Sequence, residues 1–467
     1  MELVHLRVDG LIDAGIGMAD ADGQDTAKEI EILAAIGVPN ILVLAARDHQ
    51  RLLIIVEDRW KEIFPVGEDD FLFGHDFKFM RKSGVPPPSD ILRLARLKQS
   101  ETIALIERFA TCESPSDDVA SVNRFAGLVA ESIKDAARVR ALPGGKNYGK
   151  HLRCEMILPG RKKTGQILAL GHSDTVWPLG TLRSMPVQVK KGRLWGPGVF
   201  DMKGGLALFI SAMRILRERD LPVTREIVLQ VNSDEEIGSP SSRTLTEQAA
   251  RQSLAVLVLE PAAGLDGKLK TARKGVGDYT VTVHGQSAHA GLDFEKGASA
   301  IVEMARQIEK IAGFTKLDRG ITVSPGVIEG GTRSNVVAAR CSVEIDVRVP
   351  RAADANYLAR QFAALKPFDK RCRVEVTGGV NRPPMERSAA SRALFQRARK
   401  IAREIGLQVD ECAVGGGSDG NFTAALGVPT LDGLGAVGEG AHAPHENIVL
   451  AKIPERVALL ALLVAEI

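Results

Sequence analysis

The central part of the chain contains short apolar runs that each end in a polar or charged residue. Mainly apolar runs of about four to eight residues are typical of buried strands in α/β proteins. Such runs occupy residues 166–171, 226–231 and 254–259, and a fourth strand-like run is predicted at 194–200. The apolar run at 457–464 is far shorter than a bilayer span and predicts a packed terminal helix. The pattern therefore predicts an α/β fold with buried strands.

A different pattern begins near residue 274. Apolar and polar residues alternate in some of its segments, as in half-buried strands, and follow a helical period in others. The strand-like segments are 277–284, 320–324, 337–348 and 373–377, and the helix-like segments are 298–310 and 353–364. Their order, βαββαβ, is that of a split βαβ sandwich. We therefore expect a second domain that is inserted into the first.

This pattern divides the chain into four parts. We expect a catalytic domain in two parts, 91–273 and 380–467, with the inserted domain at 274–379 between them. Residues 1–90 are unassigned and include a helix-like segment at 25–35, strand-like segments at 40–45 and 52–56, and a Pro-rich linker at 84–90. They are either an accessory domain or an upstream extension outside the functional protein.

Two adjacent carboxylates, Glu235 and Glu236, follow the strand-like run at 226–231 and are separated from it by the short polar segment 232–234. In a regular strand they would point to opposite faces, but Gly238 favours a chain that leaves extended geometry at this point. An isolated pair of this kind is usually a solvated strand end, because charged side chains mostly lie at the surface. In an active site, one carboxylate could bind a metal while the other transfers a proton. Residues elsewhere in the chain decide between these interpretations.

Histidines and carboxylates follow the other strand-like runs in a similar way. In open α/β sheets the ligand crevice lies beyond the carboxyl ends of the strands, so such side chains are expected to converge. The residues in these positions are His172, Asp201 and Glu260, and a late glycine-rich segment adds His442.

The charges of this set match two divalent cations. Asp201, Glu236 and Glu260 supply three negative charges, and a bridging hydroxide would add a fourth. His172 and His442 would complete the ligand shells as neutral imidazoles. Mixed nitrogen and oxygen ligands favour two zinc ions, although cobalt and manganese occupy similar sites. Without cations, the converging carboxylates would repel one another or bind protons.

Seven segments in a fixed order carry a family resemblance. They are 171–176, 196–205, 232–239, 259–261, 285–291, 330–335 and 415–420. From about Ile91 to the C-terminus, the chain resembles the dimetal family of glutamate carboxypeptidase, aminoacylase, acetylornithine deacetylase and succinyl-diaminopimelate desuccinylase, which is metallopeptidase family twenty. The resemblance implies a mixed-sheet α/β catalytic domain and an inserted ferredoxin-like lid, through which the protein would form a homodimer.

The resemblance also implies how the metals are held. Asp201 would bridge both ions. The remaining ligands would be His172 and Glu260 for one ion, and Glu236 and His442 for the other. A cis peptide bond between Asp201 and Met202 is implied as well.

Five further residues receive roles from the resemblance. Glu235 would be the general base, and Asp174 would accept the second ring N–H of the histidine two residues before it and fix its tautomer. Arg333, in a glycine-led loop, would bind a substrate carboxylate in a bidentate contact. His289 would reach a neighbouring active site across the dimer and stabilise the oxyanion, and Asn335 would assist substrate binding.

The resemblance implies a metal-dependent hydrolase that uses a metal-bridging hydroxide to cleave an amide next to a carboxylate-bearing amino acid. Its substrate is expected to be a small peptide or an N-acyl amino acid with a free carboxylate, and glutamate carboxypeptidase is the leading example. N-acyl amino acid deacylation stays open, as does a catalytically silent relative that binds peptides or amino acids. The complete ligand set and Glu235 argue against silence, because a binding protein has no need of a base.

Two other features are set aside. His445 lies three residues after His442, but Pro444 between them disfavours a helix that would place both on one face. The glycines at 415–417 lack the lysine and threonine of a phosphate-binding loop, so they favour a turn that lines the substrate cleft.

Composition excludes several other classes of protein. With 45% hydrophobic and 25% charged residues, the chain is typical of globular enzymes, and a net charge of +3 gives no reason to expect a nucleic-acid partner. Five scattered cysteines form neither a zinc-binding spacing nor a disulfide framework, which favours reduced thiols and a cytoplasmic location. Neither a membrane span nor a secretion signal is expected.

Overall fold

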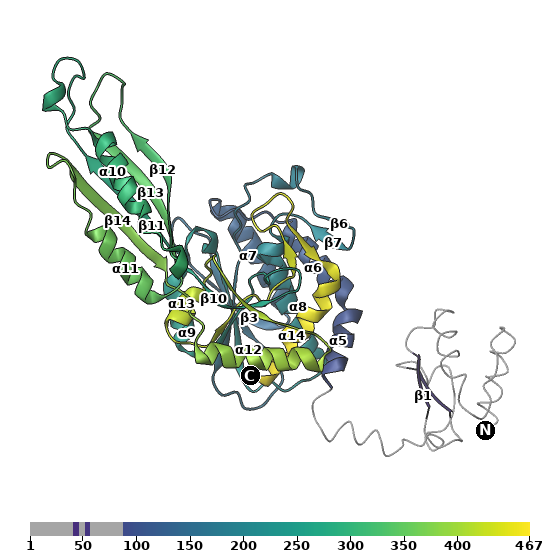
Figure 1. Ribbon diagram of the computed structural model, residues 1–467. Coiled ribbons are helices and arrows are strands. Elements are labelled where there is room, and N and C mark those ends of the chain that lie inside the picture. The colour runs from purple at the N-terminus through teal and green to yellow at the C-terminus, as the bar shows by residue number, and fades with distance from the viewer. Residues whose placement is uncertain (1–40, 46–51, 57–86) are drawn as a thin grey trace. The chain divides into compact units, whose positions relative to one another are not determined.

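The computed structural model describes residues 41–45, 52–56 and 87–467, and the chain divides into two compact units, Met1–Lys82 and Ser83–Ile467 (Figure 1). In the first unit, β1 (Ile41–Ala45) pairs antiparallel with β2 (Leu52–Val56), at the two positions where strands were expected. The helix expected at 25–35 lies outside the described residues.

A six-stranded mixed sheet forms the centre of the second unit. Its order is β16 (Thr430–Leu431), β9 (Ser253–Val258), β5 (Gln166–His172), β8 (Glu226–Asn232), β4 (His151–Met156) and β3 (Ala137–Leu142). The first four strands of this order are parallel, whereas β4 and β3 are each antiparallel to the neighbour before them. Every residue of β5 is buried, which explains the apolar run at 167–170 within it.

Helices cover both faces of this sheet. Ile167 and Ala169 of β5 belong to the larger core, which is built with α5 (Pro88–Leu97), α6 (Gln99–Ala110), α7 (Val119–Ile133), α8 (Gly204–Glu218), α12 (Ala389–Glu404) and α14 (Ile453–Glu466). Leu168 and Leu170 point the other way, into a smaller core beside α9 (Arg243–Arg251) and α13 (Gly420–Ala425). The terminal helix expected at 457–464 is thus confirmed as part of α14. None of the described helices combines the length and the apolar character that crossing a bilayer requires.

Two smaller sheets flank the core. β10 (Leu269–Arg273) pairs in parallel with β15 (Glu411–Val414). An antiparallel sheet contains β17 (Gly438–Glu439), β18 (Asn447–Val449), β7 (Arg193–Trp195) and β6 (Gln188–Lys190).

The strand predicted at 194–200 is wrong beyond Trp195. Gly196 and Gly198 have φ angles of 153° and 72°, which end the extended conformation. An irregular turn, Val199–Lys203, follows and leads into α8, and within it Asp201 and Met202 have non-helical backbone angles. Asp201 is therefore presented by a turn before a helix and not by the end of a strand. The peptide bond between Asp201 and Met202 is cis, as the family resemblance implied.

The inserted domain has the expected βαββαβ order (Figure 1). Its elements are β11 (Gly275–His284), α10 (Ala300–Ala312), β12 (Thr322–Gly330), β13 (Arg340–Val349), α11 (Ala352–Ala363) and β14 (Arg373–Arg382). The strands form one antiparallel sheet in the order β12-β13-β11-β14. Residues of α10 and α11 share a single apolar core with alternate residues of β11 and β13. The fold class predicted from the sequence is confirmed.

Candidate metal centre

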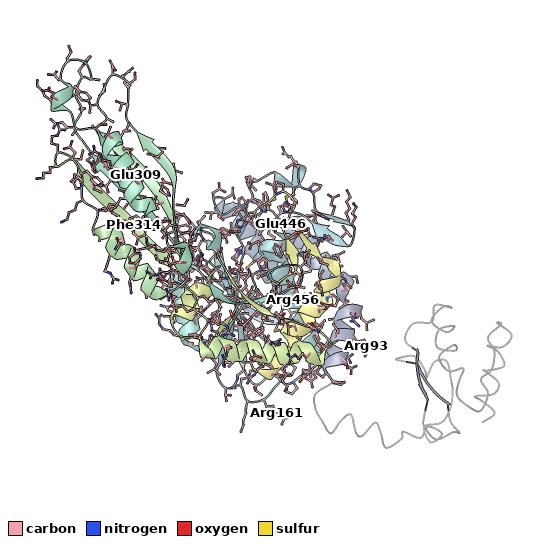
Figure 2. All side chains as sticks on the ribbon, viewed as in Figure 1. Arg93, Arg161, Glu309, Phe314, Glu446 and Arg456 are labelled. Carbon is pink, nitrogen blue, oxygen red and sulfur yellow. The ribbon has the colours of Figure 1, made fainter. Side chains whose placement is uncertain are left out.

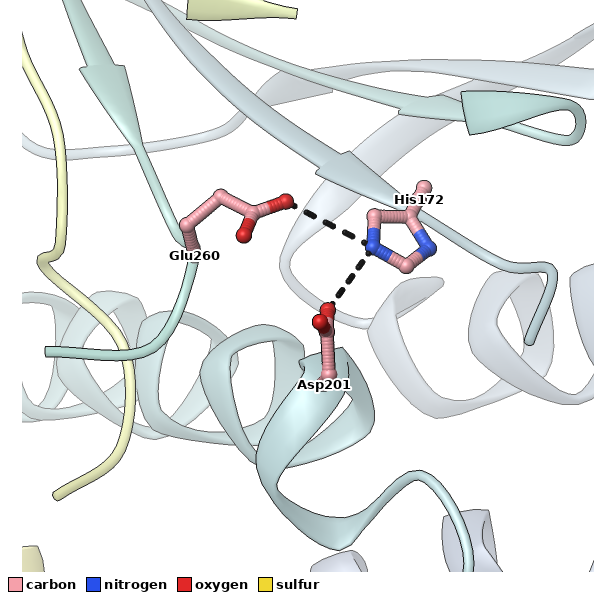
Figure 3. A group of neighbouring side chains, drawn as sticks. All are labelled: His172, Asp201 and Glu260. Carbon is pink, nitrogen blue, oxygen red and sulfur yellow. Dashed lines mark hydrogen bonds and ion pairs between the residues drawn. The ribbon is translucent and has the colours of Figure 1, made fainter. Parts of the chain in front are cut away.

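Two groups of possible metal ligands share one aspartate. The first contains His172, Asp201 and Glu260, and the second contains Asp201, Glu236 and His442. Within each group, one ligand atom per residue lies within 4.8 Å of the others. Figure 3 shows the first group, in which the carboxylates of Asp201 and Glu260 both face the His172 ring.

The two oxygens of Asp201 face different histidines. Oδ1 lies 3.2 Å from Nε2 of His172, and Oδ2 lies 3.4 Å from Nε2 of His442. Glu260 Oε1 is 3.5 Å from His172 Nε2, while Glu236 Oε2 is 3.2 Å from His442 Nε2. Each histidine thus faces Asp201 and one glutamate, so the arrangement is that of two adjoining sites around a shared carboxylate.

The central sheet explains why three of these residues meet. His172 is the last residue of β5, Glu260 follows β9, and Glu236 follows β8, and these strands are parallel neighbours. Their carboxyl ends share one edge of the sheet, which is the usual place for a ligand crevice. His442 comes from the connection between β17 and β18 and is half exposed, with 49% of its side chain accessible. The centre is therefore open to solvent on that side.

Glu235 and Glu236 leave extended geometry, as the sequence predicted. They begin a short 3₁₀ helix, Glu235–Ile237, which ends at Gly238 in the left-handed region. The carboxylate of Asp174 accepts hydrogen bonds from the backbone N–H of both glutamates, at 3.2 and 3.1 Å. It also lies 3.5 Å from Nδ1 of His172, although the nearest acceptor to that nitrogen is the backbone oxygen of Asp174 at 2.9 Å. Asp174 thus contacts both the histidine ring and the glutamate turn.

Burial and charge act against each other at Glu235. Burial raises the pKa of this carboxyl well above its usual value, and the Arg382 guanidinium opposes that shift. Arg382 Nη2 lies 3.0 Å from Glu235 Oε1 and donates to the Glu235 backbone oxygen at 2.8 Å. Its Nη1 donates to Asp419 at 2.7 Å. The last residue of β14, from the inserted domain, therefore contacts the glutamate expected to be the base.

The chemistry of the donor set fits divalent cations. Burial raises the pKa of Glu236 to about 7, and hydrogen bonds to Asp201 and Glu236 raise the pKa of His442 to about 10. Glu236 Oε1 is buried and has no hydrogen-bond partner among the described residues. Its other oxygen, Oε2, faces His442 Nε2, and carboxylate oxygens and imidazole nitrogens are ligands that zinc takes in proteins. The residues present therefore fit a pair of metal ions.

Arg273 connects the centre to the glycine-rich turn. It forms two 2.7 Å contacts with Asp432 and lies 3.4 Å from Glu260 Oε2. Its Nη1 donates to the backbone oxygens of Gly416 and Gly417, both at 3.1 Å. Sequence reasoning missed Arg273 and Arg382, because each is a single arginine at the end of a strand and neither belongs to a recognised motif.

The three residues expected to bind substrate lie together in the inserted domain. His289, Arg333 and Asn335 are all exposed. His289 Nδ1 accepts hydrogen bonds from two backbone N–H groups of its own loop, and the backbone of Ala290 donates to Asn335 O at 3.0 Å. Within residues 87–467, no hydrogen bond or ion pair joins the three side chains to the two ligand groups. Their functional roles stay predictions.

The sequence of the chain is similar to those of known hydrolases. The sequence pattern of peptidase family M20/M25/M40 matches residues 168–466. Carboxypeptidase G2 from Pseudomonas sp. (strain RS-16) is 26% identical over 390 residues, which cover 81% of this chain and 92% of that protein. Succinyl-diaminopimelate desuccinylase from Cereibacter sphaeroides is 27% identical over 321 residues, covering 63% of this chain and 81% of that protein.

The fold also resembles solved structures. Aminopeptidase PepT from Bacillus cereus ATCC 10987 superposes with a TM-score of 0.67 at 23% identity, covering 79% of this chain and 98% of that chain. The region matched by the family pattern, 168–466, includes both ligand groups and the complete inserted domain.

Proposed function

The chain belongs to peptidase family M20/M25/M40 and is a metal-dependent hydrolase, and from this premise we propose that it is a carboxypeptidase. Its substrate would be a small peptide that ends in a carboxylate-bearing amino acid, with glutamate as the leading candidate. Similarity to carboxypeptidase G2 over 81% of the chain supports this choice. Removal of a succinyl or other acyl group from an amino acid is the second candidate, and it is supported by the similarity to succinyl-diaminopimelate desuccinylase.

The observation that carries the proposal is the sharing of Asp201 between two ligand groups. His172 and Glu260 would hold one metal ion, Glu236 and His442 the other, and Asp201 both. Two divalent cations held there, with zinc as the leading candidate, would lower the pKa of a water molecule and polarise the carbonyl of the scissile amide.

Glu235 would move the proton in the reaction. A base must reach the proton that it abstracts and have a pKa suited to both accepting and releasing it. Glu235 lies beside the metal ligands, and burial and Arg382 act on its pKa in opposite directions. It would accept the proton of the attacking water at its carboxylate and pass it to the departing amine. Asp174 would hold the backbone of the glutamate turn during these steps.

Recognition of the substrate would come from the inserted domain. The Arg333 guanidinium can bind a terminal carboxylate through two parallel hydrogen bonds, and Asn335 would assist it. His289 belongs to the adjoining loop, since Ala290 is hydrogen-bonded to Asn335. We propose that this loop reaches the metal centre of a second copy of the chain and that His289 stabilises the oxyanion there.

Hydrolysis assays on matched substrates test the proposal. The metal-loaded protein is expected to release glutamate from peptidyl glutamates faster than it releases the acyl group from N-acetyl or N-succinyl amino acids. Removal of metal by a chelator should abolish turnover, because the attacking water then loses the positive charges that activate it. Addition of zinc should restore turnover. The opposite substrate preference would establish the deacylase. Two bound metals without turnover on any of these amides would instead favour a binding protein.

The homodimer proposed for this family member would use the exposed edge of the inserted sheet. β12 is an edge strand and exposes Val327 and Ile328, with 52% and 56% of their surface accessible. Ile301 and Val302 on α10 are exposed as well. An edge strand with apolar side chains is a template for pairing with a second strand. We therefore expect Ile328→Lys to convert a dimer to a monomer, as measured by light scattering after gel filtration.

A matched control is available in the same domain. Leu317 is 77% exposed and lies in the short helical turn Leu317–Arg319 before the start of β12, whereas Ile328 lies near the end of that strand. Leu317→Lys should leave the dimer intact. A wild-type protein that is monomeric at all concentrations, or an Ile328→Lys variant that still dimerises, would count against this interface.

A further inference from the structure

Glu446 is a fully buried carboxylate that the proposed chemistry does not use. Its relative exposure is 0%, and it lies four residues after His442, directly before β18. Figure 2 labels it in the catalytic part of the chain. A buried glutamate normally requires a cationic partner or several hydrogen bonds, because the loss of hydration is costly.

Four N–H groups donate to the Glu446 carboxylate. Oε1 accepts from the backbone of Phe200 at 2.9 Å and of Asp201 at 3.0 Å. Oε2 accepts from the backbone of Gly198 at 2.8 Å and from the indole of Trp177 at 2.7 Å. A carboxylate offers about four acceptor positions, so this one is saturated. Three of its donors belong to the turn that presents Asp201, and one of them is the N–H of Asp201 itself.

The same carboxylate joins three ligand-bearing segments. Trp177 lies in the segment that begins with His172, and the donors at 198–201 lie in the Asp201 turn. Glu446 itself belongs to the segment of His442, and its backbone oxygen accepts a further hydrogen bond from Gly196 at 3.3 Å. The three segments are distant in sequence and meet at this one side chain. A shift of Glu446 would therefore move ligands of both proposed metal positions.

We infer that Glu446 is a positioning residue that sets the geometry of the shared ligand Asp201 and thereby the affinity for both metal ions. The inference rests on the proposed function, because it concerns the same metal centre. Hydrogen-bonded partners of metal ligands fix ligand orientation, and their loss typically weakens metal binding. Here the partner holds the backbone of the ligand and not its side chain. The Asp201 carboxylate oxygens thus stay free to face His172 and His442.

Glutamine is the most informative replacement for Glu446, because it changes the hydrogen-bonding groups and keeps nearly the same shape. All four neighbours are donors, and an amide has two N–H groups of its own, so it keeps one acceptor oxygen and places donors against donors. Glu446→Gln should therefore break at least one of the hydrogen bonds that hold the Asp201 turn, while hardly changing the side-chain volume.

The direct measurement is the zinc affinity of the chain of residues 1–467. Titration of apoprotein with zinc, in competition with a chromogenic chelator, is expected to show dissociation constants about 10- to 100-fold higher in Glu446→Gln than in the wild type. The visible spectrum of the cobalt-loaded variant should also change, because the spectrum reports ligand geometry. A merely structural role would lower the melting temperature of the apoprotein but leave the zinc dissociation constants and the cobalt spectrum unchanged.

Glu113→Gln is the matched control. Glu113 also accepts two backbone N–H groups, those of Gly180 and Leu182, each at 2.9 Å, on a loop that carries no proposed ligand. Its zinc affinity should equal that of the wild type. If Glu446→Gln fails to fold, Trp177→Phe takes its place, because it removes one donor from the carboxylate and keeps an aromatic ring. Weaker zinc binding by Trp177→Phe is then expected, and an unchanged dissociation constant would overturn the inference.

The outcomes separate this inference from the proposed function. A wild-type protein that binds no zinc would overturn both. A wild-type protein that binds two zinc ions, together with a folded Glu446→Gln variant of equal affinity, would overturn the positioning role alone. Neither readout depends on turnover or on the choice of substrate.

Discussion

Replacing Glu235 by glutamine is expected to lower kcat by about 10²- to 10⁴-fold, the usual contribution of a general base. The amide cannot accept the proton of the attacking water or deliver one to the departing amine. The metal content should stay close to that of the wild type, because Glu235 belongs to neither ligand group. Steady-state kinetics on the best substrate, combined with metal analysis of the same preparation, measures both quantities.

The contact between Glu235 and Arg382 means that the substitution can also change the stability of the protein. Glu235 contacts Arg382, so its loss leaves a buried guanidinium with one carboxylate partner fewer, while Asp419 remains. Thermal unfolding of the variant should therefore be compared with that of the wild type. Glu247→Gln, the same chemical change on α9, serves as the control and should keep normal turnover. Near-normal kcat in a metal-loaded Glu235→Gln variant would assign proton transfer to another group.

The convergence of the ligands could be predicted from the sequence because the parallel strands of the sheet bring most of them to one edge. Apolar runs marked β5, β8 and β9, and the polar residues after them reach one edge once these strands lie parallel. Asp201 was expected at the centre for the wrong local reason. The strand β7 ends at Trp195, and an irregular turn before α8 presents Asp201 instead. Gly196 and Gly198, within this apolar stretch, are the signal in the sequence for that turn.

The supporting residues could not be identified in the same way. Arg273, Arg382 and Glu446 act on carbonyl oxygens, backbone N–H groups or carboxylates that come from distant segments. The amino-acid sequence does not show which backbone donors and acceptors these side chains will contact. Their partners are defined only after the chain has folded, so spacing along the chain carries no signal for them.

The inserted domain shows a similar limit in its edge strand. The strand expected at 320–324 overlaps the start of β12, which begins at Thr322 and continues to Gly330. Pro325 and a register shift between Pro325 and Val327 interrupt the alternation. Proline is tolerated there because β12 is at the edge of the sheet, where an N–H is not required for pairing on the outer side. Sheet order, unlike strand existence, depends on pairings that the period of the sequence does not encode.

Replacing Asp201 by alanine is expected to remove both metal ions, whereas replacing either glutamate ligand should affect mainly one. Asp201 is the only residue that belongs to both ligand groups of the described chain. Its loss leaves each group with one histidine and one glutamate, and two protein ligands rarely retain a divalent cation. After dialysis, Asp201→Ala should hold well under about one metal ion per chain and show no measurable turnover.

The metal content of Asp201→Ala should be compared with that of Glu236→Ala and Glu260→Ala. Each variant keeps one group complete, so each should retain about one tightly bound ion and lose the other. Elemental analysis gives the stoichiometry, and circular dichroism of the apoproteins checks that all three variants are folded. Equal metal loss in the three variants would indicate a single mononuclear site. Two ions retained by Asp201→Ala would contradict the shared ligand, and with it the coupling between the metal centre and the turn that Glu446 holds.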